Sequence, residues 1–167
     1  MAVQVNLSQE AKFYDNLLGM VNEEVKKHLK KIESLHIRTP VSSQMADLAE
    51  SFIRAYSNNK RVVIEKFIEK SYPFWNKIHV KDIQFFYQNA DSILGGFATE
   101  KASMFRSILD AKDPKTGKKV LTTNDMDILW KYFHSFVVIS IGYLERNSAL
   151  VKVYPLTPEI KSIWKKK

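Results

Sequence analysis

The chain has 167 residues, of which 45% are hydrophobic and 26% are charged, and it contains no cysteine. This length and balance predict one globular domain rather than a disordered segment. The missing cysteines exclude disulfides, thiolate metal sites and thiol nucleophiles. Five glycines and five prolines are too few for a β-sandwich or barrel, in which turns recur after about ten residues.

The net charge of +8 is concentrated in two short segments. Residues 112–119 hold four lysines and one aspartate, and residues 161–167 hold four lysines and no acid, so together they carry seven of the eight charges. Of the 26 basic residues in the chain, 21 are lysine. Because arginine dominates the reading of base edges and the bidentate binding of phosphate, this composition favours nonspecific attraction to an acidic or polyanionic partner.

A long helix is predicted from Ser8, a good N-cap, to about residue 35. Its apolar residues recur at alternating spacings of three and four, which is a heptad seam that His28 interrupts. In a monomer the seam would face the core, and in a dimer it would pair with a second copy. Protonation of His28 would place a charge in whichever interface holds it.

Further helices are predicted between cap residues, prolines and glycines. The longest, residues 123–146, is apolar on most sides and follows a start that resembles a capping box, Thr122-Thr123-Asn124-Asp125. Its uncharged run is too short to span a bilayer, so we expect a buried helix at the centre of the fold. The other predicted helices cover about residues 42–57, 60–71, 73–78, 82–87 and 99–112, and a short C-terminal helix begins at about residue 157.

Two connecting segments have local signatures. Residues 113–117, Asp-Pro-Lys-Thr-Gly, predict a tight turn because proline fixes φ and glycine permits a positive φ. Residues 150–154 alternate enough to predict a short strand. The fold prediction is therefore an all-α, single-domain bundle of six to eight helices around residues 123–146. The helical domain would cover residues 1–156, and residues 157–167 would form a short basic C-terminal helix and tail.

Pairs of titratable residues have a chemical and a simpler interpretation. Glu24 and His28, at i,i+4, would suit two metal ligands, but a surface ion pair produces the same spacing. Glu65 and Glu69 resemble an acid–base pair, but neighbouring basic residues favour a solvated charged face. No serine lies in a nucleophile elbow, and no glycine pattern suits a phosphate loop. We expect no catalytic residue, no metal and no cofactor.

Two surfaces are candidate binding sites. Asp127, Lys131, His134 and Ser135 form a polar stripe on the apolar helix, which is either satisfied by neighbouring elements or lines a groove or subunit contact. The C-terminal segment has an apolar face that either docks on the body or is captured by an acidic partner, a membrane surface or nucleic acid. The predicted partner-binding residues are Lys115, Lys118, Lys119, Ile160, Trp164, Lys165, Lys166 and Lys167.

Residues 125–136, Asp-Met-Asp-Ile-Leu-Trp-Lys-Tyr-Phe-His-Ser-Phe, resemble the late hydrophobic helix of small helical proteins encoded by large DNA viruses. The resemblance implies a small virion or host-interaction protein. An apolar helix wrapped by amphipathic ones is also similar to the Bcl-2-like fold. However, Leu94-Gly95-Gly96 lacks the arginine that follows glycine in the usual BH1-type motif.

The sequence thus predicts a non-enzymatic structural or protein-interaction protein, a component of a viral or other large assembly. One alternative is a nonspecific nucleic-acid-binding module that uses the lysine-rich loop and tail, and another is a Bcl-2-like host-interaction protein. With no cysteine and no visible secretory signal, the expected location is the cytoplasm or a virion. The expected partner is another protein or a second copy, with nucleic acid or a membrane surface as alternatives and no transmembrane segment.

Overall fold

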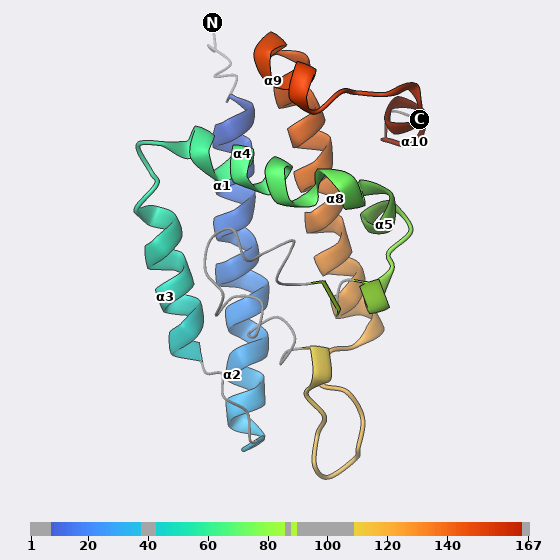
Figure 1. The fold of residues 1–167 in the computed structure, drawn as a ribbon. Coiled ribbons are helices and arrows are strands. Elements are labelled where there is room, and N and C mark those ends of the chain that lie inside the picture. The colour runs from blue at the N-terminus through green and yellow to red at the C-terminus, as the bar shows by residue number, and fades with distance from the viewer. Residues whose placement is uncertain (1–7, 38–42, 86–87, 90–108, 165–167) are drawn as a thin grey trace, which may run out of the picture.

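The computed structural model describes residues 8–37, 43–85, 88–89 and 109–164. Within these ranges all regular elements are helices, which confirms the predicted all-α class (Figure 1). The described helices number seven when the continuous rod Gln9–Ser34 is taken as one, within the predicted six to eight. Their buried side chains form one hydrophobic cluster, as expected for a single domain.

The N-terminal rod consists of α1 (Gln9–Gly19), a π-helical turn η1 (Met20–Val25) and α2 (Lys26–Ser34). Ser8 caps it as predicted, since its Oγ accepts a hydrogen bond from the Ala11 N–H at 3.3 Å. The π-helical turn is not foreseen by the sequence pattern. Every residue of the heptad seam is buried or half-buried. The seam therefore faces the core of this chain, as the monomer interpretation predicts.

The rod changes its packing partners along its length. α1 packs against α4 (Lys60–Ser71) and α8 (Thr123–Glu145), whereas α2 packs against α3 (Ser43–Arg54). η1 contacts both α3 and α8. The π-helical turn thus lies where the rod passes from one set of neighbours to the other.

Helix α4 matches the predicted range 60–71, and it is followed by a 3-10 turn η2 (Tyr72–Phe74) and by α5 (Trp75–His79). Pro73 lies in the first turn, as predicted. The Ser71 hydroxyl donates to the Phe67 carbonyl at 2.6 Å and accepts from Trp75 Nε1 at 2.9 Å. These bonds satisfy the buried polar atoms at the junction of the two helices.

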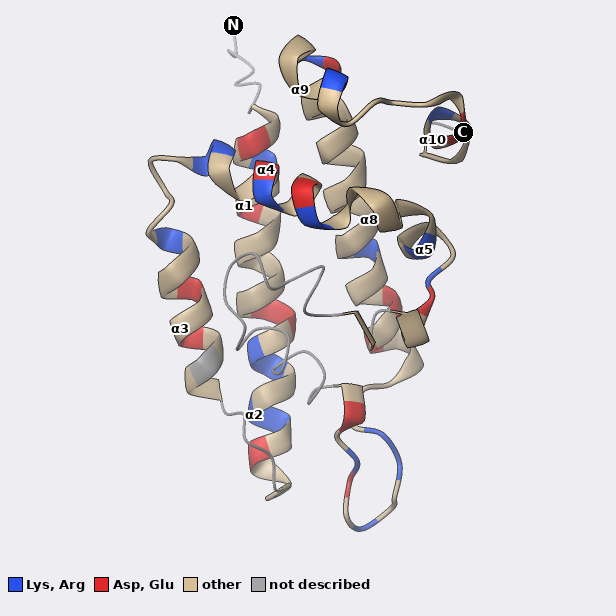
Figure 2. Ribbon diagram, viewed as in Figure 1, with Lys and Arg blue, Asp and Glu red and all other residues tan. Residues whose placement is uncertain are grey.

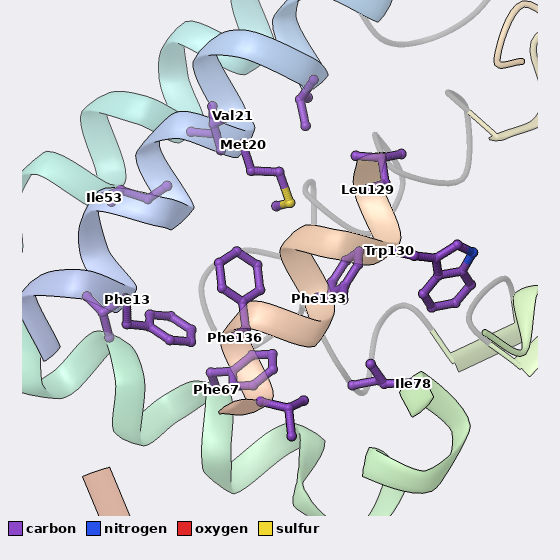
Figure 3. Packing of buried hydrophobic residues seen from close by; sticks show 14 of the residues in the cluster. Phe13, Met20, Val21, Ile53, Phe67, Ile78, Leu129, Trp130, Phe133 and Phe136 are labelled. Carbon is purple, nitrogen blue, oxygen red and sulfur yellow. The ribbon is translucent and has the colours of Figure 1, made fainter. Parts of the chain in front are cut away.

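Helix α8 begins with the predicted capping box. The Asp125 N–H donates to Thr122 Oγ1 at 3.1 Å, and the Thr122 N–H donates to Asp125 Oδ2 at 3.0 Å. The helix contacts α1, α4, α5 and α9 (Ser148–Val153). In Figure 3, the rings of Phe136 of α8, Phe13 and Phe67 lie together, and each pair of ring centroids is 4.9 to 5.7 Å apart. Such tilted and edge-on rings add to the stability gained by burial.

The strand predicted at residues 150–154 is wrong, because most of these residues belong to helix α9. Its start is capped by Asn147, whose Oδ1 accepts from the Leu150 N–H at 3.2 Å. A lone strand would leave its backbone groups unpaired, whereas a helix satisfies them within the segment. The predicted C-terminal helix is confirmed as α10 (Pro158–Trp164), which packs against α5. Most of the predicted helix at residues 99–112 and the segment 94–96 lie outside the described residues.

Candidate functional site

The lysine hairpin, which we define as residues 112–119, projects from one end of the body (Figures 1 and 2). Its base is closed by an antiparallel bridge between Lys112 and Lys119 and by the Val120 N–H, which donates to the Ala111 carbonyl at 2.9 Å. Above it, the Asp113 N–H donates to the Lys118 carbonyl at 2.8 Å. The predicted turn is therefore an ordered hairpin.

The tip of the lysine hairpin is fixed by residues that the sequence singles out. Asp113 Oδ1 accepts from the Lys115 N–H at 2.8 Å, and the Gly117 N–H donates to the Asp113 carbonyl at 2.8 Å. Gly117 has φ = 71°, in the left-handed region that glycine adopts without strain. A side chain and a glycine together hold the tip in one conformation.

All four lysines of the hairpin are exposed: Lys112, Lys115, Lys118 and Lys119. Within the described part of the chain, none of them forms an ion pair. Figure 2 shows basic residues on both arms of the loop, and the sequence has one acidic residue, Asp113, among them. The arrangement gives an uncompensated positive patch that an anionic partner can approach without displacing an internal counterion.

A cavity of about 470 Å³ lies at the base of the lysine hairpin, and we call it the hairpin cavity. Its volume is within the range of ligand-binding pockets. The apolar walls are Ile83, Leu109, Leu121, Met126 and Trp130. The polar rim is formed by Lys81, Gln84, Asp110, Lys119, Thr123 and Asp127. Because the six rim residues are exposed, the cavity opens to solvent through a ring of hydrogen-bonding groups.

Lys81 of this rim has an unusual backbone conformation, with φ = 56°. It ends α5 in a Schellman motif, in which the Lys81 N–H donates to the Ile78 carbonyl at 3.1 Å and the Asp82 N–H donates to the Lys77 carbonyl at 3.0 Å. Glycine is the usual residue at this position because side chains disfavour the left-handed region. The chain thus holds a lysine side chain at the rim where glycine would be less strained.

Some residues of the polar stripe of α8 are satisfied by neighbouring elements, and others lie at a groove or on the surface. His134 Nε2 donates to the Ile78 carbonyl at 3.0 Å, and Ser135 Oγ accepts from Asn16 Nδ2 at 2.9 Å, so neighbouring elements satisfy these two. Burial lowers the pKa of His134 and so favours the neutral form of its ring. Asp127 instead lies on the rim of the hairpin cavity, and Lys131 is exposed.

The apolar face of α10 is docked on the body, as the simpler interpretation predicts. The Trp164 ring centroid lies 5.1 Å from that of His134 and 5.4 Å from that of His79. Ile160 is half-buried against the core. In Figure 1, α10 lies well away from the lysine hairpin. The structure therefore does not bring Ile160 and Trp164 together with Lys115, Lys118 and Lys119, and Lys165, Lys166 and Lys167 lie outside the described residues.

The favoured interpretation of the Glu24–His28 pair as a surface ion pair is wrong. His28 is 1% exposed and Glu24 is 8% exposed, because this face of the rod is turned inward. Among the described residues, no group of three or more acidic or histidine side chains is placed to hold a metal ion. Glu65, expected on a solvated face, accepts a hydrogen bond from the Tyr143 hydroxyl at 2.5 Å.

Comparison with known proteins yields no relative: no family model, no curated protein and no solved structure matches this chain. None of the described helices has the length and apolar composition that crossing a lipid bilayer requires. The lysine hairpin and the cavity at its base are thus defined by their own geometry and charge.

Proposed function

We propose that this chain is a non-enzymatic interaction protein that binds an acidic segment of another protein through its lysine hairpin. The observation that carries the proposal is an ordered hairpin whose four exposed lysines form no ion pair with any other residue that the structure describes. Because the tip is already fixed by Asp113 and Gly117, little conformational entropy of the backbone is lost on binding.

An acidic protein suits the lysine hairpin better than nucleic acid does. The hairpin contains no arginine and no aromatic residue. It therefore lacks the bidentate groups that read base edges and the rings on which unpaired bases stack. Lysine ammonium groups attract any anion, so a carboxylate-rich segment needs nothing that the hairpin lacks. We accordingly treat nucleic acid as the competing outcome of the experiment.

The setting that we propose is a larger intracellular assembly. The resemblance of residues 125–136 to a helix of small viral proteins leads us to include the virion among the candidate assemblies. A partner that carries many carboxylates would be drawn to the hairpin by long-range attraction and held by short-range contacts elsewhere.

The proposal is tested with a triple variant, Lys115→Gln, Lys118→Gln and Lys119→Gln. Its matched control neutralises three exposed lysines of the body instead: Lys30→Gln, Lys31→Gln and Lys70→Gln. The probes are a nine-residue peptide rich in aspartate and glutamate and an oligothymidylate of similar charge, both at low salt. We expect the hairpin variant to lose about tenfold in affinity for the peptide, while the control and both melting temperatures stay nearly unchanged.

A second variant separates geometry from charge. Gly117→Ala keeps every lysine but strains the tip, where φ is 71°. If the ordered array matters, its affinity for the peptide falls although the net charge is unchanged. Equal losses in the hairpin variant and the body control would contradict the proposal. Preferential binding of the oligothymidylate would favour the nucleic-acid module instead.

A further inference from the structure

We infer that the hairpin cavity receives an apolar side chain from the same acidic segment that the lysine hairpin binds. This inference rests on the proposed function and adds the chemistry of the partner: an acidic stretch interrupted by a large apolar residue. Such an anchor residue would supply affinity and register, which charge attraction alone does not.

The walls of the cavity are suited to an anchor. Leu109, Leu121 and Trp130 are buried, and Met126 is half-buried. A volume of about 470 Å³ accommodates a leucine or phenylalanine side chain together with the adjoining backbone. Each CH₂ group buried against such walls is worth about fourfold in affinity.

The rim favours a polypeptide over a small ion. Lys81 and Lys119 supply positive groups, whereas Asp110 and Asp127 supply negative ones. A phosphate or a metal ion would meet repulsion from two of the four charged rim residues. A polypeptide backbone carries N–H donors for the carboxylates and carbonyl acceptors for the ammonium groups, so it pairs with both signs.

The lysine hairpin and the cavity form one continuous surface, because Lys119 belongs to both. A segment whose carboxylates lie along the hairpin therefore reaches the cavity without leaving the protein. The left-handed backbone of Lys81 supports the same conclusion. A residue kept in a strained conformation at a binding rim is a recognised sign of functional use.

The test uses four nine-residue acidic peptides that differ only in their central residue, which is glycine, alanine, leucine or phenylalanine. Binding to the full-length, ¹⁵N-labelled protein is followed by NMR at low salt. We expect the leucine and phenylalanine peptides to bind at least about tenfold more tightly than the glycine peptide. We also expect them alone to shift the indole N–H resonance of Trp130.

Two rim-filling variants, Thr123→Trp and Gln84→Trp, locate the effect. Both positions are exposed, and either indole would occupy the cavity mouth. Each should remove the advantage of the leucine and phenylalanine peptides over the glycine peptide, because the apolar side chain can no longer enter the cavity. The matched control is Val138→Trp, at an exposed position of α8 outside the cavity lining, and it should keep the advantage.

The outcomes separate this inference from the proposed function. Equal affinity for all four peptides would overturn the cavity inference and leave the lysine hairpin as the binding element. A preference for apolar centres that survives both rim-filling variants would overturn it too, because the anchor would lie elsewhere. If the wild-type protein binds none of the four peptides, the proposed function itself fails and the inference falls with it.

Discussion

The Nε2 atom of His28 lies 3.5 Å from Oε2 of Glu24 in the interior of the protein. Among the residues that the structure describes, none forms a hydrogen bond with either ring nitrogen of His28 or with this carboxylate oxygen. Burial disfavours the charged imidazole and lowers the pKa of His28 below its ordinary value. The charged groups that face it are Glu24, Lys27 and Lys31 of its own rod and Asp125 of α8.

A pH-dependent stability follows from this lowered pKa. Between pH 6.5, the ordinary histidine value, and the lower pKa of folded His28, the unfolded chain binds more protons than the folded chain. The free energy of unfolding therefore decreases as the pH falls through this window. Denaturant titrations from pH 7.5 to 5 should show this decrease in the wild type and a flatter profile in His28→Leu.

The control for this experiment is His36→Gln, which changes an exposed histidine at the end of α2. It should keep the wild-type slope. A His28→Leu profile as steep as that of the wild type would show that other groups cause the pH dependence. His134, whose pKa is also lowered by burial, is the first of these to examine.

Replacing Lys81 by glycine should stabilise the protein. The substitution relieves a left-handed backbone with φ = 56°, so we expect the free energy of unfolding to rise by about 1 kcal/mol. If Lys81 also binds the partner, affinity for the acidic peptides should fall in the same variant. The matched control is His36→Gly, because His36 also has a left-handed backbone, with φ = 53°. This variant should stabilise the protein without changing its affinity for the acidic peptides. A destabilised Lys81→Gly variant would contradict the assignment of strain.

Tyr143→Phe tests a hydrogen bond that links α8 to α4. The buried Tyr143 hydroxyl donates to Glu65 Oε2 at 2.5 Å, and burial together with this carboxylate raises the pKa of the phenol. Losing the bond should lower the free energy of unfolding by about 1–2 kcal/mol, measured by denaturant titration. Tyr132→Phe removes a longer, exposed contact of 3.4 Å to Glu23. Tyr143→Phe should therefore lose more free energy of unfolding than Tyr132→Phe does. An equal loss in the two variants would argue against a special role for Tyr143.

Trp164→Ala tests whether α10 is held by its aromatic contacts. Removing the indole eliminates its packing on His79 and His134. We expect a loss of about 1–3 kcal/mol in the free energy of unfolding, below the cost at a fully buried tryptophan. Detachment should also accelerate trypsin cleavage after Lys161. Val153→Ala, at an exposed position of α9, should leave both measurements unchanged, and an intact α10 in Trp164→Ala would refute this anchoring.

Local signals in the sequence determine much of the fold. Ser8, Thr122 with Asp125, and Thr157 are cap residues in the structure as they are in the sequence pattern. The strand predicted at residues 150–154 fails because a short alternating run is compatible with either element. The cap at Asn147 was the signal that could have decided in favour of a helix.

The candidate site is less accessible to sequence reasoning. The lysines of the hairpin and the residues of its turn lie within one short stretch of sequence, so both can be predicted from local patterns. The hairpin cavity is assembled from residues 81–84, 109–121 and 123–130, which only the tertiary fold brings together. The burial of His28 likewise depends on tertiary packing, since its helix α2 packs against α3. The left-handed Lys81 has no sequence signal, because glycine is the residue that normally marks such a position.

The π-helical turn η1 also has a consequence for how the protein opens. It lies between α1, which packs on α4 and α8, and α2, which packs on α3. Among the described elements, the α2–α3 pair contacts the rest of the protein chiefly through η1. A pair joined in this way can separate without disrupting the aromatic core of α1, α4 and α8. We therefore expect the amide hydrogens of α2 and α3 to exchange with solvent by a partial unfolding of lower free energy than the global transition.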